Sequence, residues 1–159
     1  MVPDGTFTYR DLWPKDNISL FNRTVTSSAV YQNSTVTLDD VMNNDVAKIG
    51  DYGEAADGVI KLTTDYYTDQ NVNKSLDEFE QKGTIFSPTK WNCSNFVKGG
   101  INASGANVSG EENIVGVTVV TPNRLFVDTK PLKNASILKE PAVNLNAPWY
   151  ERRISSSKK

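Results

Sequence analysis

The chain has one cysteine, Cys93, which lies in the string Trp91-Asn92-Cys93-Ser94-Asn95-Phe96-Val97, where a loop turns into a predicted helix. Amide N–H groups and the positive end of the helix dipole stabilise a thiolate, so a helix N-terminus lowers the pKa of a cysteine. A lowered pKa turns a cysteine into a nucleophile near neutral pH. We therefore predict Cys93 as a candidate nucleophile; a buried structural thiol is the alternative interpretation.

The neighbours of Cys93 are the candidates for substrate contacts: Trp91, Asn92, Ser94 and Asn95. We expect Asn92 to cap the helix, and Phe96 and Val97 to anchor it in the core. Trp91 has two interpretations, as the wall of a substrate groove or as packing beneath the helix.

The 159 residues include no histidine. With one cysteine and no histidine, the chain cannot form an internal disulfide, a Cys/His zinc site, a Ser-His-Asp triad or a Cys-His pair. We predict no metal and no cofactor.

The string Asn92-Cys93-Ser94-Asn95-Phe96-Val97 resembles the nucleophile segment of permuted papain-like proteins, the NlpC/P60 and lecithin:retinol acyltransferase-like group. A predicted strand (58–64), an acidic helix (69–81) and a loop precede it in the order that this group uses. Thr121-Pro122-Asn123-Arg124-Leu125-Phe126 resembles a segment in C-terminal domains of bacterial Rhs-type polymorphic toxins, as does the opening Leu12-Trp13-Pro14. The resemblance covers roughly residues 50–130.

This resemblance implies a papain-like fold with Cys93 as the nucleophile. It implies a secreted bacterial effector or toxin domain that acts as a cysteine hydrolase or acyltransferase on an amide or ester of a protein, peptide or lipid. A cognate immunity protein is the implied partner. The alternatives are a non-catalytic interaction domain on the same scaffold, with a structural Cys93, and an immunity or adaptor protein.

The general base in these families is a histidine upstream of the cysteine, and this chain departs from that pattern. Three accounts remain open. The domain only binds; or a carboxylate replaces the imidazole, with Glu54 and Asp57 placed for this by sequence order; or a histidine was replaced, with Ala29, Ala55 and Ala56 as possible positions. A carboxylate is a poor base for a thiol unless burial raises its pKa.

The elements that would position Cys93 indicate an α+β class, a small antiparallel sheet with helices packed on one side. Residues 1–16 are predicted as an extended lead-in without a strong element, 17–140 as one α+β domain, and 141–159 as a tail. Apolar and β-branched patterns predict strands at 25–31, 34–38, 58–64 and 114–120. Helices are predicted to start at Thr37, and to span 69–81, 92–102 and 123–127; 84–90 and 103–113 are predicted as loops.

Composition narrows the function classes further. Hydrophobic residues make up 38% and charged residues 23% of the chain, which is typical of a folded domain. The net charge of −2 argues against a nucleic-acid binder that neutralises phosphates. No apolar run approaches the ~18 residues of a membrane span. The start of the chain lacks the pattern of a signal peptide, so we expect a cytosolic chain, one exported by a signal-less route, or one cut from a longer polypeptide. The resemblance to toxin domains implies secretion or delivery into a target cell as part of a larger polypeptide.

Overall fold

Residues 5–15, 26–43, 58–142 and 144 are described by the computed structural model of this chain. The strands are β1 (Thr6–Pro14), β2 (Ser27–Thr37), β3 (Val59–Leu62), β4 (Ile85–Phe86), β5 (Glu111–Ile114), β6 (Val117–Val120) and β7 (Ala135–Lys139). The helices are α1 (Leu38–Asn43), α2 (Tyr66–Lys82), α3 (Cys93–Ala103) and α4 (Pro122–Thr129). The strands form three small antiparallel sheets, β1-β2-β4, β3-β7 and β5-β6. The predicted α+β class is confirmed, but the single small antiparallel sheet of the prediction is replaced by three.

The N-terminal segment forms a strand along its whole described length. β1 pairs with β2 from Thr6↔Thr37 to Pro14↔Ala29. The segment is extended, as predicted, but the expectation that it holds no strong element is wrong, because pairing with β2 makes it a regular strand although polar residues lie on both of its faces. The two strands predicted at 25–31 and 34–38 are one continuous strand, and Val25 lies outside the described residues.

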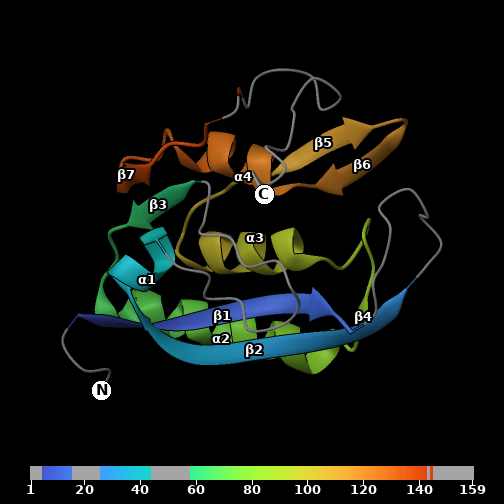
Figure 1. The fold of residues 1–159 in the computed structure, drawn as a ribbon, viewed down its shortest axis with the longest axis horizontal. Coiled ribbons are helices and arrows are strands. Elements are labelled where there is room, and N and C mark those ends of the chain that lie inside the picture. Colours follow the sequence, from blue (N-terminus) through green and yellow to red (C-terminus); the bar gives the residue numbers. More distant parts are fainter. Residues whose placement is uncertain (1–4, 16–25, 44–57, 143, 145–159) are drawn as a thin grey trace.

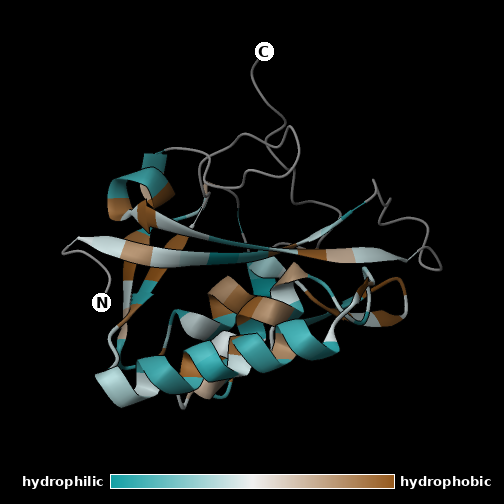
Figure 2. Ribbon diagram, turned by 90° about the horizontal axis from the view of Figure 1, so that it is seen from below, coloured by the Kyte–Doolittle hydropathy of each residue, from teal (hydrophilic) through white to brown (hydrophobic). Residues whose placement is uncertain are grey.

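The alternation of β1 places Arg10 and Leu12 on the face that packs on the helices. Leu12 is fully buried, and together with Phe86 and Phe96 it forms the core between the β1-β2 sheet and helices α2 and α3. Arg10 reaches α2, where its guanidinium pairs with Asp77 (2.8 Å) and Glu80 (2.5 Å). Figure 2 shows the strands of this sheet crossing above α2, whose polar face points outward.

Helix α2 starts three residues earlier than the predicted 69–81, because the Asp65 side chain caps it by accepting from the amide of Thr68. Gly83 ends the helix, and its amide donates to the carbonyl oxygen of Phe79. An added Cβ at Gly83 would lie 1.8 Å from Nε1 of Trp91, so this position leaves no room for a side chain. The start of α1 agrees with the prediction, with Thr37 accepting from the amide of Asp40.

The C-terminal half packs on the opposite side of α3. In Figure 1, α3 lies between the β1-β2 sheet and a second group of elements formed by β3, β7, α4 and the β5-β6 hairpin. Its core consists of Val108, Val120 and Leu125, with Ile101 of α3 packed against it. Helix α3 therefore contributes one face to each of the two cores.

Three predictions for residues after α2 need correction. The strand predicted at 114–120 is instead a hairpin, with a two-residue turn at Val115 and Gly116 whose φ angles are 50° and 78°. Strand β7 falls in a region predicted only as the end of the domain, and it pairs with β3. The loop predicted at 84–90 contains the short strand β4. Helix α4 contains the predicted 123–127, with Pro122 at its first position and Thr121 as its cap.

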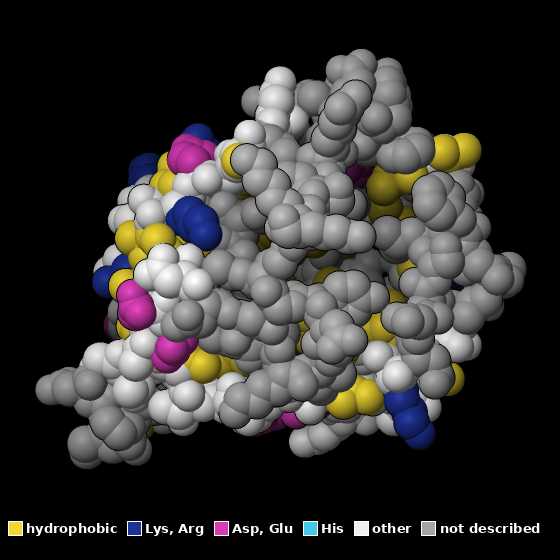
Figure 3. All heavy atoms as spheres, viewed as in Figure 1, with side chains coloured by type: hydrophobic (Ala, Val, Ile, Leu, Met, Phe, Trp, Pro, Cys, Tyr) yellow, Lys and Arg dark blue, Asp and Glu magenta, His cyan; other side chains and the backbone are white. Residues whose placement is uncertain are grey.

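Charged side chains on the surface are mixed in sign. Figure 3 shows acidic and basic groups interspersed along one edge of the molecule. On the surface, Lys130 and Glu140 form an exposed ion pair of 2.5 Å.

Candidate active site

Cys93 is the first residue of α3, as the sequence predicts. Asn92 caps the helix: its side-chain oxygen accepts from the amide of Asn95 (2.9 Å), and the Asn95 side chain accepts from the amide of Asn92 (3.2 Å). This reciprocal capping box satisfies two of the amides at the helix start. Helix geometry leaves the amides of Cys93 and Ser94 without acceptors inside the helix, and these two amides lie beside the thiol.

The amide group of Asn92 connects the starts of two helices. Its Nδ2 atom donates to the carbonyl oxygen of Pro88 (2.8 Å) and to that of Val120 (3.3 Å). Val120 directly precedes Thr121, the cap of α4. The N-termini of α3 and α4 are therefore held next to each other, with the Asn92 side chain buried between them.

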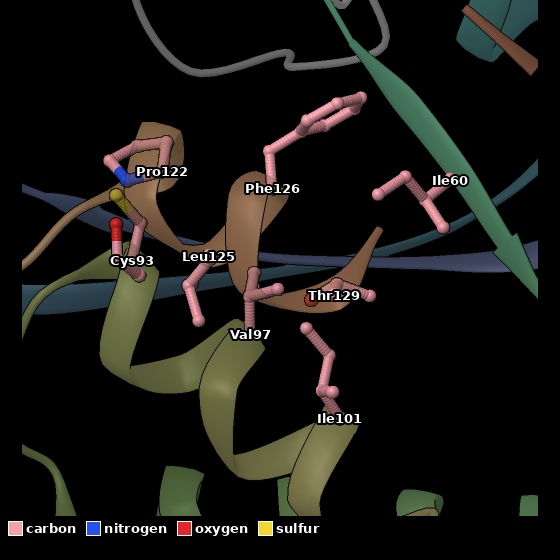
Figure 4. Close-up of a pocket in the computed structure, with 9 residues that line it drawn as sticks. Ile60, Cys93, Val97, Ile101, Pro122, Leu125, Phe126 and Thr129 are labelled. Atoms are coloured by element: carbon pink, nitrogen blue, oxygen red, sulfur yellow. The ribbon is translucent and has the colours of Figure 1, made fainter. Parts of the chain in front are cut away.

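A mostly apolar cavity of about 310 Å³ opens at Cys93. Figure 4 shows Cys93 and Pro122 at one end and Ile60, Ile101 and Thr129 towards the other. On α3, the lining residues Cys93, Val97 and Ile101 stand four residues apart and so share one face of the helix. On α4, the lining consists of Pro122, Leu125, Phe126 and Thr129; Ser94 and Ile60 complete it.

Val97 belongs to this cavity rather than to the core. It is 47% exposed, whereas Phe96 is 2% exposed. The expectation that both residues anchor the helix in the core is therefore wrong for Val97. Adjacent helical positions point about 100° apart, so the two side chains cannot face the same layer.

The surroundings of the thiol oppose its ionisation. Burial raises the pKa of the Cys93 thiol, and the Asp11 carboxylate raises it further, while hydrogen bonds from Ser94 and from the Cys93 amide lower it in part. The direction is opposite to the lowering expected for a cysteine at a helix N-terminus. Desolvation outweighs the amide groups here, because the thiol lies in a cavity lined mostly by apolar residues of both helices.

Asp11 is the carboxylate whose charge acts on Cys93. It accepts hydrogen bonds from the Tyr9 hydroxyl (2.6 Å), the Leu12 amide (2.7 Å) and the Trp13 indole (2.5 Å). Burial raises the pKa of the Asp11 carboxyl, and these three hydrogen bonds oppose the rise. This raised pKa is the property that a carboxylate needs in order to accept a proton from a thiol.

Sequence reasoning missed Asp11. The sequence did hold a signal for it. In a strand, residues two positions apart share one face, so Asp11 lies on the same face as the aromatic donors Tyr9 and Trp13. The predicted bases Glu54 and Asp57 lie outside the described residues, as do Ala55 and Ala56. Ala29 packs against the core of Leu12, Phe86 and Phe96.

The predicted substrate contacts separate into two groups. Ser94 is buried and lines the cavity. Asn92 and Asn95 form the capping box, and Trp91 packs beneath the helix, stacked on Phe79 with ring centroids 4.0 Å apart. The Trp91 indole donates to the Tyr31 hydroxyl (3.2 Å), so of its two interpretations the structure shows the packing one.

Comparisons with protein-family models, with curated proteins and with solved structures found no match to this chain. Within the described residues, no three His, Cys, Asp or Glu side chains gather as a metal site would require. None of the helices in the described ranges is both long enough and apolar enough to cross a bilayer.

Proposed function

We propose that this domain is a cysteine-dependent acyl hydrolase or acyltransferase with Cys93 as its nucleophile. The observation that carries the proposal is the position of the thiol, at the start of α3 and at one end of an apolar cavity. A reacting carbonyl at the thiol would have its acyl group in the cavity and its oxygen near the amides of Cys93 and Ser94. The substrate class is an amide or ester of a protein, peptide or lipid.

In the proposed reaction, Asp11 accepts the thiol proton in place of a histidine. The sulfur then attacks the carbonyl carbon, and the carbonyl π electrons move to oxygen, where amide N–H groups stabilise the charge. When the tetrahedral intermediate collapses, the bond to the leaving group breaks and the leaving group takes the proton from Asp11. Water, an amine or an alcohol then cleaves the resulting thioester, with Asp11 again accepting the proton of the attacking group.

The wider context of the proposal is a papain-like effector or toxin domain from a bacterium, with an immunity protein as partner. It rests on the sequence resemblance of the segments around Leu12, Cys93 and Pro122. Expression of the native chain in a bacterial host is expected to arrest growth, and Cys93→Ala is expected to relieve the arrest. Unimpaired growth with the native chain would count against the toxin context.

The chemistry itself is tested by trapping the thioester. The native protein, incubated with p-nitrophenyl octanoate and analysed by intact-mass spectrometry, is expected to gain one octanoyl group on Cys93. Cys93→Ala is expected to gain none, and Asp11→Asn is expected to acylate more slowly. Equal ester cleavage by native protein and Cys93→Ala would overturn the assignment of the nucleophile.

The raised pKa of Cys93 favours a second candidate, a non-catalytic domain that binds an apolar ligand. In that case the cavity binds its ligand without forming a covalent bond to it. Iodoacetamide separates the two candidates: alkylation of Cys93 in the folded protein supports the nucleophile, whereas labelling only after unfolding supports the binding domain.

A further inference from the structure

The cavity wall is apolar along its whole length beyond the Cys93 end. Its lining residues, as far as the structure describes them, include no charged side chain. Thr129 belongs to the lining, but its hydroxyl oxygen is covered, so it presents no polar side-chain atom to the cavity. The polar lining side chains that remain, Cys93 and Ser94, are adjacent at the start of α3. A ligand therefore meets polar side chains at one end only.

This wall favours one chemical class of ligand. A peptide carries an N–H and a carbonyl group at nearly every residue, and these groups lose their hydrogen bonds to water when they enter an apolar cavity. A hydrocarbon chain loses none, and it gains free energy with every methylene group that leaves water. The wall of Val97, Leu125 and Phe126 therefore favours the acyl chain of a lipid over a peptide.

Helix α3 sets the length of the chain that fits. Its lining residues Cys93, Val97 and Ile101 stand four residues apart, so Val97 lies about 6 Å and Ile101 about 12 Å along the helix from the cysteine. With C–C bonds of about 1.5 Å at tetrahedral angles, an extended alkyl chain advances roughly 1.3 Å per carbon. The distance to Ile101 thus corresponds to about nine carbons, and the distance to Val97 to about five.

Val97 lies at the middle of this path and can be changed without disturbing a core. The residue is half-exposed and belongs to neither of the two core clusters. Figure 4 shows it between the Cys93 end and Ile101. A larger side chain at this position would block the far part of the cavity and leave the Cys93 end open.

We infer that the substrate of this site is an ester of an unbranched, medium-length fatty acid, and that the small side chain of Val97 lets the acyl chain extend along α3 to Ile101. This inference rests on the proposed function, because it places the reacting carbonyl at Cys93. It narrows the substrate class from protein, peptide or lipid to a lipid. It also assigns Val97 as a residue that determines chain-length specificity.

The test measures binding without reaction, in Cys93→Ala protein. Methyl butanoate, methyl octanoate and the peptide ester N-acetyl-alanyl-alanine methyl ester are titrated by calorimetry. A second substitution, Val97→Phe, narrows the cavity at its middle. Ile85→Phe is the matched control, because Ile85 is an exposed β-branched residue of β4 that is not among the lining residues. Far-UV circular dichroism checks that each variant is folded.

Methyl octanoate is expected to bind at least about tenfold more tightly than methyl butanoate, because it has four further methylene groups to remove from water. The peptide ester is expected to bind more weakly than either. Val97→Phe is expected to make the Kd values of the two fatty esters nearly equal, and Ile85→Phe to leave their ratio unchanged.

Two results would overturn the lipid assignment: a peptide ester that binds as tightly as methyl octanoate, and a methyl octanoate that binds no better than methyl butanoate or does not bind. A preference for octanoate that survives Val97→Phe would overturn the role of Val97.

The same titration separates this inference from the proposed chemistry. If Cys93→Ala protein binds the octanoate in a Val97-dependent way while native protein forms no thioester, the ligand class stands and the nucleophile fails. If native protein forms the thioester at equal rates from p-nitrophenyl butanoate and p-nitrophenyl octanoate, the nucleophile stands and the assignment of the acyl chain fails.

Discussion

The side-chain amide of Asn92 donates a hydrogen bond of 3.3 Å to the carbonyl oxygen of Val120, and this bond joins the start of α3 to the start of α4. The same nitrogen also donates to Pro88, while the side-chain oxygen caps α3. One buried residue thus sets the geometry of both helices that form the cavity. Its contribution to stability has two separable parts, the helix cap and the donated hydrogen bonds.

Asn92→Ala removes both parts and is expected to lower the free energy of unfolding by about 3 kcal/mol. Asn92→Ser keeps a capping oxygen and loses the donors to Pro88 and Val120, so we expect a loss of roughly half that size. Urea denaturation of the two variants measures the difference. Equal losses would mean that the cap contributes nothing at this site.

Thr129→Val is expected to raise the free energy of unfolding by about 1 kcal/mol, because it replaces an unpartnered buried hydroxyl by a methyl group of similar shape. Thr129→Ser keeps the hydroxyl and loses the methyl group, so we expect it to lower stability. Thermal or urea unfolding without ligand measures both. A loss of stability in the valine variant would reveal a partner for the hydroxyl.

Gly83 and Gly99 are predicted to respond to alanine in opposite directions. At Gly83 the new Cβ would overlap Trp91 and lie 2.4 Å from the Tyr31 hydroxyl, so we expect a loss of about 2–3 kcal/mol. At Gly99, inside α3, the nearest atom belongs to Phe79 at 3.8 Å, so alanine fits and its helix propensity adds up to ~1 kcal/mol. Unfolding curves of the two variants provide the comparison, and a tolerated alanine at Gly83 would contradict the observed packing of Trp91.

Val115 carries backbone strain at an exposed turn. Its φ of 50° lies in the left-handed region, which β-branched residues rarely adopt, and the next residue is Gly116. Val115→Asn creates the Asn-Gly pair that such two-residue hairpins favour, and it is expected to stabilise the protein by about 1 kcal/mol. Val115→Thr, which remains β-branched, is the control and is expected to give no gain by the same unfolding assay.

Local patterns predicted the helix at Cys93 well, because a capping residue and the spacing of apolar side chains are both encoded within a few positions. The same patterns did not indicate which apolar residues face the cavity. Val97 and Phe96 are equally hydrophobic, and only the packing of α4 on one side and α2 on the other separates their roles. Asp11 is 82 positions from Cys93, so only tertiary structure brings its charge near the thiol.

Local sequence patterns were equally limited in predicting the β-strands. Strand β1 lacks a simple alternation of apolar and polar residues, because one face carries the half-buried Asp11 with its aromatic donors and the other carries Arg10 beside Leu12. The strand predicted at 114–120 runs through the turn of the β5-β6 hairpin, because Val115 is one of a series of β-branched residues that continues on both sides of the turn. Tertiary contacts override local propensity at both places.

The coupling between Asp11 and Cys93 gives the sharpest test of the proposed chemistry. Because the carboxylate raises the pKa of the thiol, Asp11→Asn is expected to lower that pKa and to shift the pH midpoint of iodoacetamide alkylation downwards. At a fixed pH below the native midpoint, the variant therefore alkylates faster.

If Asp11 is also the base, the same substitution slows thioester formation, so the rates of alkylation and of thioester formation change in opposite directions. Glu78→Gln removes an exposed carboxylate of α2 that pairs only with the exposed Lys82, and it serves as the charge control, with no change expected in either rate. An Asp11→Asn variant that acylates at the native rate would assign the proton to another group and leave Asp11 with only an electrostatic effect on the thiol.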